Sequence, residues 1–84
     1  MYYVYLLRSI KYRKIYIGIT DDVPTRLQEH NRGESQWTSY FRPWKLIYYE
    51  AYSDPRDAQI RERRLKYHGK ALGQLKRRLT HCLS

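Results

Sequence analysis

The stretch from residue 14 to residue 20 constrains the fold most, because it combines the composition of a β-strand with a glycine near its centre. Its β-branched and aromatic residues predict a strand. Tyr16 and Gly18 are two positions apart and therefore lie on the same face of that strand. Because glycine weakens a strand, Gly18 is expected where a backbone or a ligand must approach closely.

A second tyrosine-rich stretch, residues 2–8, lies just upstream and predicts a β-hairpin with residues 14–20. The face that carries Ile15, Ile17 and Ile19 is the better candidate for the core. The tyrosine faces of the hairpin are then expected to form a polar-aromatic surface. The pairing register stays open, because the sequence alone does not specify it.

Hydrophobic periodicity and helix-capping residues divide the rest of the chain. Pro24 is tolerated in the first turn of a helix that Gly33 ends, and Pro55 and Gly69 bound a second helix in the same way. The predicted elements are strands at residues 2–8, 14–20 and 44–52, helices at 22–32, 55–68 and 70–79, and a loop at 34–43. Their order is β-β-α-β-α-α.

The chain of 84 residues is expected to form one domain, residues 1–84, and its net charge of +9 is unevenly distributed. From Arg56 onward there are nine Lys or Arg and two Asp or Glu, which accounts for +7 of the total. Nucleic acid is the first candidate partner for such a surface, and an anionic membrane or protein is the second. The single Cys82, the absence of a signal-peptide pattern and the absence of a long apolar run predict a cytoplasmic protein with no membrane partner.

Three groups of residues are candidates for chemistry, and each has two interpretations. Arg26 and His30 are four apart and share one stripe of the first predicted helix, either as a site beside Gly18 or as solvated surface residues. Glu62 lies on the same helical stripe as apolar residues but among basic neighbours. It is either one partner of an ordinary ion pair or a ligand for a hard cation such as Mg²⁺.

The predicted loop at residues 34–43 is the third group. Its aromatic residues Trp37, Tyr40 and Phe41 precede Arg42, and aromatic side chains next to basic ones suit contact with bases and phosphates. The same aromatic side chains could equally cover the edge of the core.

Together these features resemble the GIY-YIG nuclease family, in particular its small stand-alone bacterial members, which are often called predicted endonucleases. The resemblance covers nearly the whole chain. It rests on residues 1–8 as the first motif, Tyr16-Ile17-Gly18 as the second, Arg26 and His30 as helix positions, Thr38 and Arg42-Pro43 in the loop, and residues 58–66 as the glutamate helix. Three positions depart from the family pattern: the first motif lacks its glycine at Tyr3-Val4-Tyr5, Ile19 replaces a lysine, and Gln74 is the nearest equivalent of an asparagine.

The resemblance implies an α/β (α+β) fold, in which a small three-stranded antiparallel sheet is flanked by helices. It also implies metal-dependent hydrolysis of phosphodiester bonds in DNA, in repair or processing. Glu62 would be the only protein ligand of one divalent metal, Mg²⁺ or Mn²⁺. The residues expected to contact nucleic acid are Gly18, Arg42, Arg61, Lys66 and Lys70.

The same resemblance assigns roles to four further residues. Tyr5 and Tyr16 would flank the attacking water, one of them as general base, and which of the two is the base stays open. Arg26 would neutralise the scissile phosphate, and His30 would assist in proton transfer or phosphate contact. No small-molecule cofactor is implied, and a protein partner could supply targeting.

Two other functions remain as alternatives to a DNA endonuclease. A nucleic-acid-binding module could keep the fold with little or no cleavage, since the equivalents of the family lysine and asparagine are missing. A basic domain that binds proteins or membrane surfaces is the third hypothesis. Metal-dependent product formation separates the first two, whereas salt dependence does not, because both predict phosphate contacts.

Overall fold

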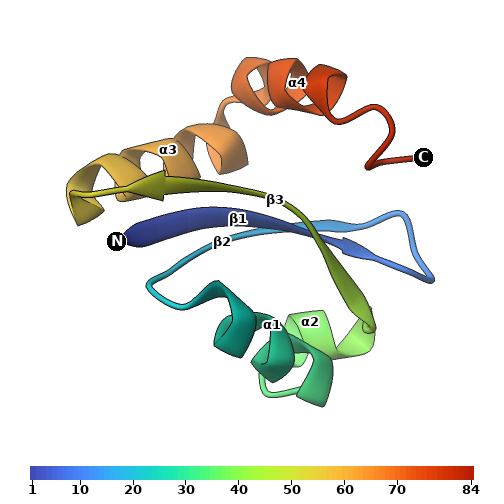
Figure 1. The fold of residues 1–84 in the computed structure, drawn as a ribbon. Coiled ribbons are helices and arrows are strands. Elements are labelled where there is room, and N and C mark those ends of the chain that lie inside the picture. Colours follow the sequence, from blue (N-terminus) through green and yellow to red (C-terminus); the bar gives the residue numbers. More distant parts are fainter.

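The computed structural model describes residues 1–84 and contains three strands and four helices (Figure 1). In chain order these are β1 (Tyr2–Ser9), β2 (Ile15–Thr20), α1 (Val23–Arg32), α2 (Gln36–Tyr40), β3 (Trp44–Tyr52), α3 (Pro55–Tyr67) and α4 (Gly69–Arg78). The predicted α+β fold with a three-stranded antiparallel sheet is confirmed. None of the helices has the length and apolar character needed to cross a membrane.

The sheet has the strand order β2-β1-β3, so β1 lies in the centre and pairs antiparallel with both neighbours. The expected hairpin forms, and its register places Tyr5 opposite Gly18 and Leu6 opposite Ile17. On the other side of β1, the register with β3 shifts between Leu6 and Leu7. The register that the sequence left open therefore brings Tyr5 and Gly18 together.

Helices cover both faces of the sheet, as Figure 1 shows: α3 and α4 lie on one side, and α1 and α2 lie on the other. The larger core lies on the α3 and α4 side, and the predicted isoleucine face belongs to it. Its buried members are Val4, Leu6, Ile17, Ala58, Leu65, Leu75 and Leu79. Ile15 and Ile19 pack against this cluster as partly buried residues.

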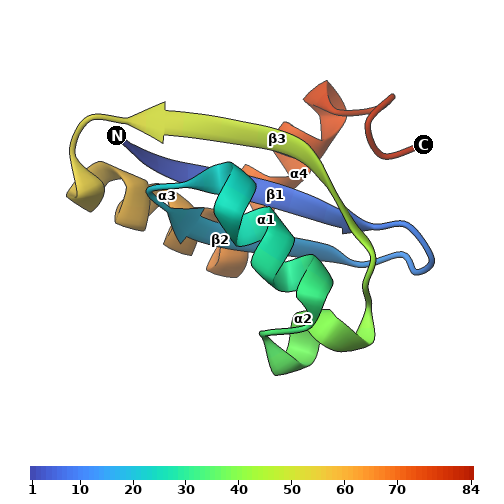
Figure 2. The same cartoon turned by 60° about the horizontal axis from the view of Figure 1, so that its bottom comes forward.

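A second core lies on the opposite face of the sheet, beneath α1, which crosses the strands in Figure 2. Its buried members are Tyr5, Leu7, Val23 and Trp44. The prediction that the tyrosine faces of the hairpin form a surface is therefore wrong for Tyr5, which is 1 % exposed. The physical reason is that α1 places Val23 and Leu27 on this face and removes it from water.

Helix α1 begins at Val23, one residue after the predicted start, and ends at Arg32 as predicted. The Asp22 carboxylate caps it by accepting hydrogen bonds from the backbone N–H (3.2 Å) and the hydroxyl (2.8 Å) of Thr25. Gly33 ends it with φ 83°, a left-handed conformation that glycine adopts without steric cost. These caps fix the position of the Arg26 and His30 stripe along the sheet.

The prediction of an uninterrupted loop at residues 34–43 is wrong, because residues 36–40 form α2. A helix of five residues is too short to show helical periodicity in its sequence. Tertiary contacts hold it: the Trp44 indole N–H donates to the Thr38 carbonyl at 2.7 Å, and the Phe41 ring packs against the second core. The α3 and α4 boundary also differs slightly, since His68 separates the helices and Gly69 begins α4.

Candidate active site

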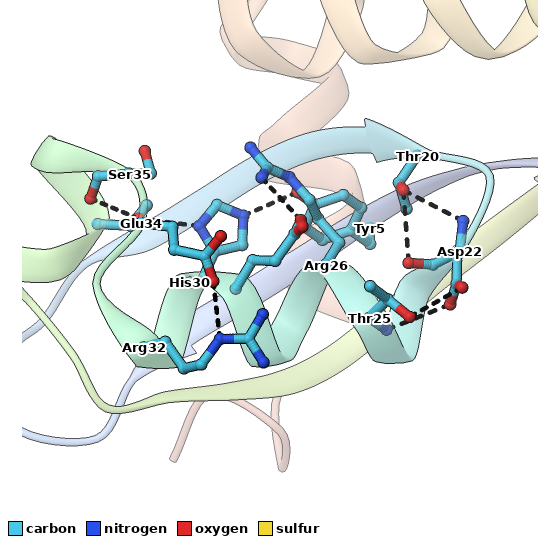
Figure 3. A network of polar contacts seen from close by, with 11 residues as sticks. Tyr5, Thr20, Asp22, Thr25, Arg26, His30, Arg32, Glu34 and Ser35 are labelled. Carbon is cyan, nitrogen blue, oxygen red and sulfur yellow. Dashed lines mark hydrogen bonds and ion pairs between the residues drawn. The ribbon is translucent and has the colours of Figure 1, made fainter.

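Gly18 gives the Tyr5 side chain its place in the fold. A Cβ atom at Gly18 would overlap the Tyr5 ring, including its hydroxyl oxygen. The close approach expected at this glycine is thus made by a side chain of the neighbouring strand. As a result, Tyr5 lies flat across β2, with its hydroxyl directed toward α1 (Figure 3).

The Tyr5 hydroxyl and His30 of α1 belong to a buried chain of hydrogen bonds (Figure 3). The Tyr5 Oη atom lies 2.9 Å from His30 Nε2, and His30 Nδ1 lies 2.8 Å from Thr38 Oγ1. The Thr38 hydroxyl donates its one hydrogen to the Ser35 carbonyl at 3.2 Å, so it accepts from His30. On this basis we assign the imidazole proton to Nδ1, which leaves Nε2 to accept from Tyr5.

Burial shifts the pKa values of Tyr5 and His30 in opposite directions, and in both cases it favours the neutral form. Desolvation raises the pKa of the Tyr5 phenol far above its usual range, and the neighbouring Tyr16 adds to this, while the charge of Arg26 acts against it. Desolvation lowers the pKa of His30, and the charge of Arg26 lowers it further. His30 is thus a neutral hydrogen-bond acceptor near pH 7.

Arg26 lies one turn before His30 on α1, and both side chains extend toward the Tyr5 hydroxyl in Figure 3. The Arg26 guanidinium is partly exposed and forms an ion pair with Glu29 at 3.1 Å. His30 is fully buried, so the alternative of a surface histidine is wrong. The helical spacing correctly predicted that Arg26 and His30 share a stripe. Because α1 packs over β1, the His30 end of this stripe is buried.

Tyr16 lies on β2 at the edge of the sheet and is partly exposed, unlike Tyr5. Its ring centroid is 4.7 Å from that of His30 and 6.1 Å from that of Tyr5. The two tyrosines and His30 therefore form one aromatic cluster, in which Tyr5 is the inner ring and Tyr16 the accessible one.

Glu62 belongs to α3, on the opposite face of the sheet, and is connected to this cluster by Lys66. The Lys66 Nζ atom lies 3.4 Å from the Glu62 carboxylate and 6.0 Å from the centroid of the Tyr16 ring. The ordinary ion pair considered for Glu62 is therefore present. Because β2 is an edge strand, the Lys66 ammonium of α3 can lie near both the Glu62 carboxylate and the Tyr16 ring.

The comparison with known proteins agrees with this set of residues: a family model of the GIY-YIG catalytic domain matches residues 1–80. The chain belongs to the GIY-YIG family. This is a nuclease family, so the resemblance expected from the motifs is confirmed. No solved structure matches the chain.

Several small bacterial proteins, all called UPF0213 protein, are similar to this GIY-YIG chain. That of Clostridium perfringens is 37% identical over 67 residues, which cover 79% of this chain and 71% of the relative. That of Lacticaseibacillus paracasei is 36% identical over 67 residues, 79% of this chain and 74% of the relative. That of Staphylococcus haemolyticus is 35% identical over 66 residues, 77% of this chain and 79% of the relative.

A divalent metal is the group that the GIY-YIG family generally uses. No three side chains of His, Cys, Asp or Glu gather in this structure as a metal cage. The Glu62 carboxylate, with its side chain 19% exposed, still fits a hard cation of the Mg²⁺ type. Mg²⁺ keeps several waters and is usually held by one or two carboxylates together with substrate phosphates.

The expected nucleic-acid contacts of this GIY-YIG chain are in different environments. Lys70 is exposed at the start of α4, and Arg42 is exposed with its guanidinium against Gly33. Lys66 is partly exposed between Glu62 and Tyr16, whereas Gly18 is buried beneath the Tyr5 ring. Arg61 is already engaged elsewhere, in an ion pair with Glu50.

Glu50 is a residue whose role the sequence did not predict. Its carboxylate accepts hydrogen bonds from Arg61 Nε (2.9 Å) and Nη2 (3.0 Å), and from the hydroxyls of Tyr48 and Tyr52. Burial by itself raises the pKa of Glu50, but these four donors outweigh it and hold the pKa below its usual value. The network joins β3 to α3 at the residue that precedes Glu62.

Asn31 is a further residue whose role the sequence did not predict, and Thr38, named there only as a loop position of the family, has a role that the motif did not specify. Thr38 is fully buried as the partner of His30. The Asn31 side chain accepts from the Trp44 backbone N–H at 2.6 Å and donates to its carbonyl at 3.1 Å, which ties α1 to β3. Local sequence does not specify either role, because both depend on contacts across the fold.

Proposed function

We propose that this protein is a metal-dependent DNA endonuclease that hydrolyses phosphodiester bonds, in DNA repair or processing in the cytoplasm. The observation that carries the proposal is the directed hydrogen-bond chain from Tyr5 through His30 to Thr38, with Arg26 beside it. The chain links the Tyr5 phenol to the neutral His30 imidazole, and the Arg26 guanidinium beside them can bind a phosphate.

Tyr5 and His30 act together as the general base. Burial raises the pKa of Tyr5, so its phenolate forms only if the proton has an acceptor close by. His30 Nε2 is that acceptor at 2.9 Å, and its Nδ1 proton stays on the Thr38 side. Attack on the phosphorus then transfers the proton of the water to Tyr5 Oη as the Tyr5 proton moves to His30.

Tyr16 and Arg26 hold the reacting groups. Tyr16 is the accessible ring of the pair, so it orients the water and the phosphate at the edge of β2. Arg26 offers a guanidinium that makes a two-pronged contact to phosphate oxygens and neutralises charge that develops in the transition state. This requires it to exchange its partner Glu29 for the substrate.

Glu62 would hold the divalent metal, with Mg²⁺ or Mn²⁺ as the candidates, and would exchange its ion pair with Lys66 for it. When bound, such an ion polarises a phosphoryl oxygen and stabilises the leaving oxygen. Lys66 would then be free to contact a phosphate of the DNA.

The remaining DNA contacts follow from exposure. Lys70 and Arg42 have exposed side chains and are proposed to contact phosphates directly. Gly18 acts indirectly, because it leaves the space that the Tyr5 ring occupies. Arg61 is proposed to contact DNA while its guanidinium stays paired with Glu50. A domain with so few free side chains has little capacity for base recognition, so we propose that a protein partner supplies targeting.

Incubation of the pure protein with supercoiled plasmid and single-stranded oligonucleotides, in Mg²⁺, Mn²⁺ or chelator, tests the proposal. Wild type should cleave only with metal, and Glu62→Gln should lose cleavage. Glu34→Gln is the matched control, because Glu34 is also paired with an arginine, but at the surface, and it should cleave like wild type. Cleavage in chelator, or undiminished cleavage by Glu62→Gln, would contradict the assignment.

A nucleic-acid-binding module is the second candidate function, and one observation favours it. Tyr5 is buried, and its pKa is raised despite the nearby Arg26, so the free protein holds its proposed base in the neutral form. If wild type and Glu62→Gln both bind DNA and neither cleaves any substrate with any metal, the binding module is the correct function.

A further inference from the structure

Four aromatic side chains form a continuous row outside the candidate active site, in which three exposed rings surround the partly buried ring of Phe41. We call it the aromatic ridge: Tyr12, Trp37, Tyr40 and Phe41. Ring centroids are 4.9 Å apart for Trp37 and Phe41, 4.9 Å for Tyr40 and Phe41, and 5.4 Å for Tyr12 and Phe41. Tyr12 is 45% exposed, Trp37 48% and Tyr40 73%. So much aromatic surface in contact with water is typical of an interaction site.

Hydrogen bonds hold the two segments of the ridge together. The Ser9 hydroxyl donates to the Phe41 carbonyl at 2.6 Å and accepts from the Tyr12 backbone N–H at 3.1 Å. The backbone N–H of Ile10 donates to the Pro43 carbonyl at 3.0 Å. The connection between β1 and β2 is thereby held against the chain after α2, which keeps the two segments that carry the rings side by side.

The ridge continues into the candidate active site through Trp37. Its ring centroid is 6.2 Å from that of Tyr16, with an angle of 35° between the rings. It also stacks on the buried Trp44 at 6.0 Å and 29°. A flat group on Trp37 would therefore lie next to the group that Tyr16 contacts.

The two segments that carry the ridge contain basic residues and no acidic ones. Residues 10–14 and 35–43 contain Lys11, Arg13, Lys14 and Arg42 and no Asp or Glu. The Lys14 ammonium lies 5.4 Å from the centroid of the Phe41 ring. An anionic ligand that offers flat rings suits this surface, and nucleic acid has both properties.

We propose that the aromatic ridge stacks unpaired bases of a single-stranded DNA segment that flanks the scissile phosphate, with Trp37 taking the nearest base. In a duplex the base faces are covered by their neighbours, so only unpaired nucleotides can stack on protein rings. The substrate of this site is then DNA with a single-stranded portion. This inference rests on the proposed nuclease function for the position of the scissile phosphate.

The test is binding of labelled oligothymidylate and of a mixed-sequence duplex, measured by fluorescence anisotropy in chelator so that no cleavage occurs. Trp37→Ala should weaken oligothymidylate affinity about tenfold and duplex affinity less than about twofold. Trp37→Phe should restore most of the loss, since it keeps a ring. Tyr67→Ala is the matched control, because Tyr67 is 77% exposed on α3 and outside the ridge, and its affinities should equal those of wild type.

Other outcomes overturn the inference. Equal weakening of oligothymidylate and duplex by Trp37→Ala, or no weakening of either, would mean that the ridge does not stack bases. Wild type that binds oligothymidylate no better than heparin would mean that the surface recognises charge only, and a protein would become its candidate partner.

A cleavage assay with Mg²⁺ separates failure of this inference from failure of the proposed function. Selective loss of oligothymidylate binding in Trp37→Ala, without cleavage by wild type, would leave the ridge in place and remove the nuclease. Cleavage of single strands by Trp37→Ala at the wild-type rate, together with unchanged binding, would leave the nuclease function in place and show that the ridge does not stack bases.

Discussion

Tyr5 depends on two residues at once, because its ring needs the space above Gly18 and its hydroxyl needs the nitrogen of His30. The first contact sets where the ring lies, and the second sets where its proton can go. A substitution at Gly18 or His30 therefore changes the position of the Tyr5 ring or of its proton, although Tyr5 itself is kept.

Gly18→Ala should destabilise the protein by about 2 kcal/mol, because the added methyl overlaps the Tyr5 ring and forces it from its place. Urea unfolding measures the loss, and the plasmid assay should show reduced cleavage at the same time. Gly73→Ala is the matched control. Nothing lies within 4 Å of the methyl it adds, and alanine favours the helix by up to about 1 kcal/mol. Equal stability of Gly18→Ala and wild type would contradict this account of the glycine.

His30 should make stability depend on pH in a predictable direction. Its pKa is lower in the folded protein than the ordinary value of about 6.5, because it is buried and faces Arg26. The unfolded chain therefore takes up the proton first. The stabilisation by neutral His30 is complete above about pH 6.5 and is lost as the pH falls through the lower folded value.

Urea midpoints measured from about pH 8 to pH 5 should fall for wild type and fall less for His30→Gln, which has no imidazole to protonate. His81→Gln removes an exposed histidine and should keep the wild-type slope. If His30→Gln and wild type lose stability in parallel, the titrating group is another residue.

At the scale of elements, the joint between β3 and α3 depends on Glu50, whose carboxylate receives four hydrogen bonds. Glu50→Gln should cost about 2 kcal/mol in urea unfolding at pH 7, because it removes the charge that Arg61 faces in a partly buried site. Since the pKa of Glu50 is lowered in the fold, this difference should be full above about pH 4.3 and disappear as the pH falls through the folded value.

Glu34→Gln provides the comparison for Glu50→Gln, because its ion pair with Arg32 is exposed and should contribute only a few tenths of a kcal/mol. Similar losses in the two variants would mean that the Glu50 network contributes no more than a surface pair.

Unfolding measurements at high pH offer a second check of the Glu50 network. Burial and the bond to Glu50 raise the pKa of Tyr52 to about 12, so the stabilisation it gives should be lost above about pH 10.

Elements with a strong period could be predicted from the sequence, and elements made by tertiary contact could not. The strands β1, β2 and β3 lie where composition places them, and Gly33 ends α1 as expected. Helix α2 escaped prediction because its single turn depends on Trp44 and Phe41.

The same division holds for the candidate site. Tyr5, Tyr16, Arg26, His30 and Glu62 could be named from motifs. What the motifs could not specify is that Tyr5 is the buried ring and Tyr16 the open one, or that Thr38 orients His30. Both depend on the strand register and on how α1 lies over β1, which are long-range properties of the fold.

For the whole molecule, the charge of the C-terminal third lies on α3 and α4, whereas Tyr5 and His30 lie beneath α1 on the other face of the sheet (Figure 1). The edge of β2, where Lys66 and Tyr16 meet, connects the two faces, and we expect DNA to bind across it. Affinity should therefore fall steeply with salt, as expected for contacts to several phosphates.

Lys70→Gln should reduce the slope of log affinity against log salt by about 0.9 for one lost phosphate contact. Arg61→Gln should reduce it less, because the Arg61 guanidinium is engaged with Glu50. Anisotropy titrations in chelator at several salt concentrations measure both slopes. A larger reduction for Arg61→Gln than for Lys70→Gln would mean that Arg61 leaves Glu50 to bind DNA.

The central strand β1 supplies alternate side chains to the two cores, with Val4 and Leu6 on one face and Tyr5 and Leu7 on the other. One residue inserted into or deleted from this strand would exchange the two sets beyond that point. Aliphatic side chains would then replace the phenol beside His30, and the phenol would enter the aliphatic core. Homologues of this protein can therefore vary in the length of their loops, while the spacing within β1 has to be inherited unchanged.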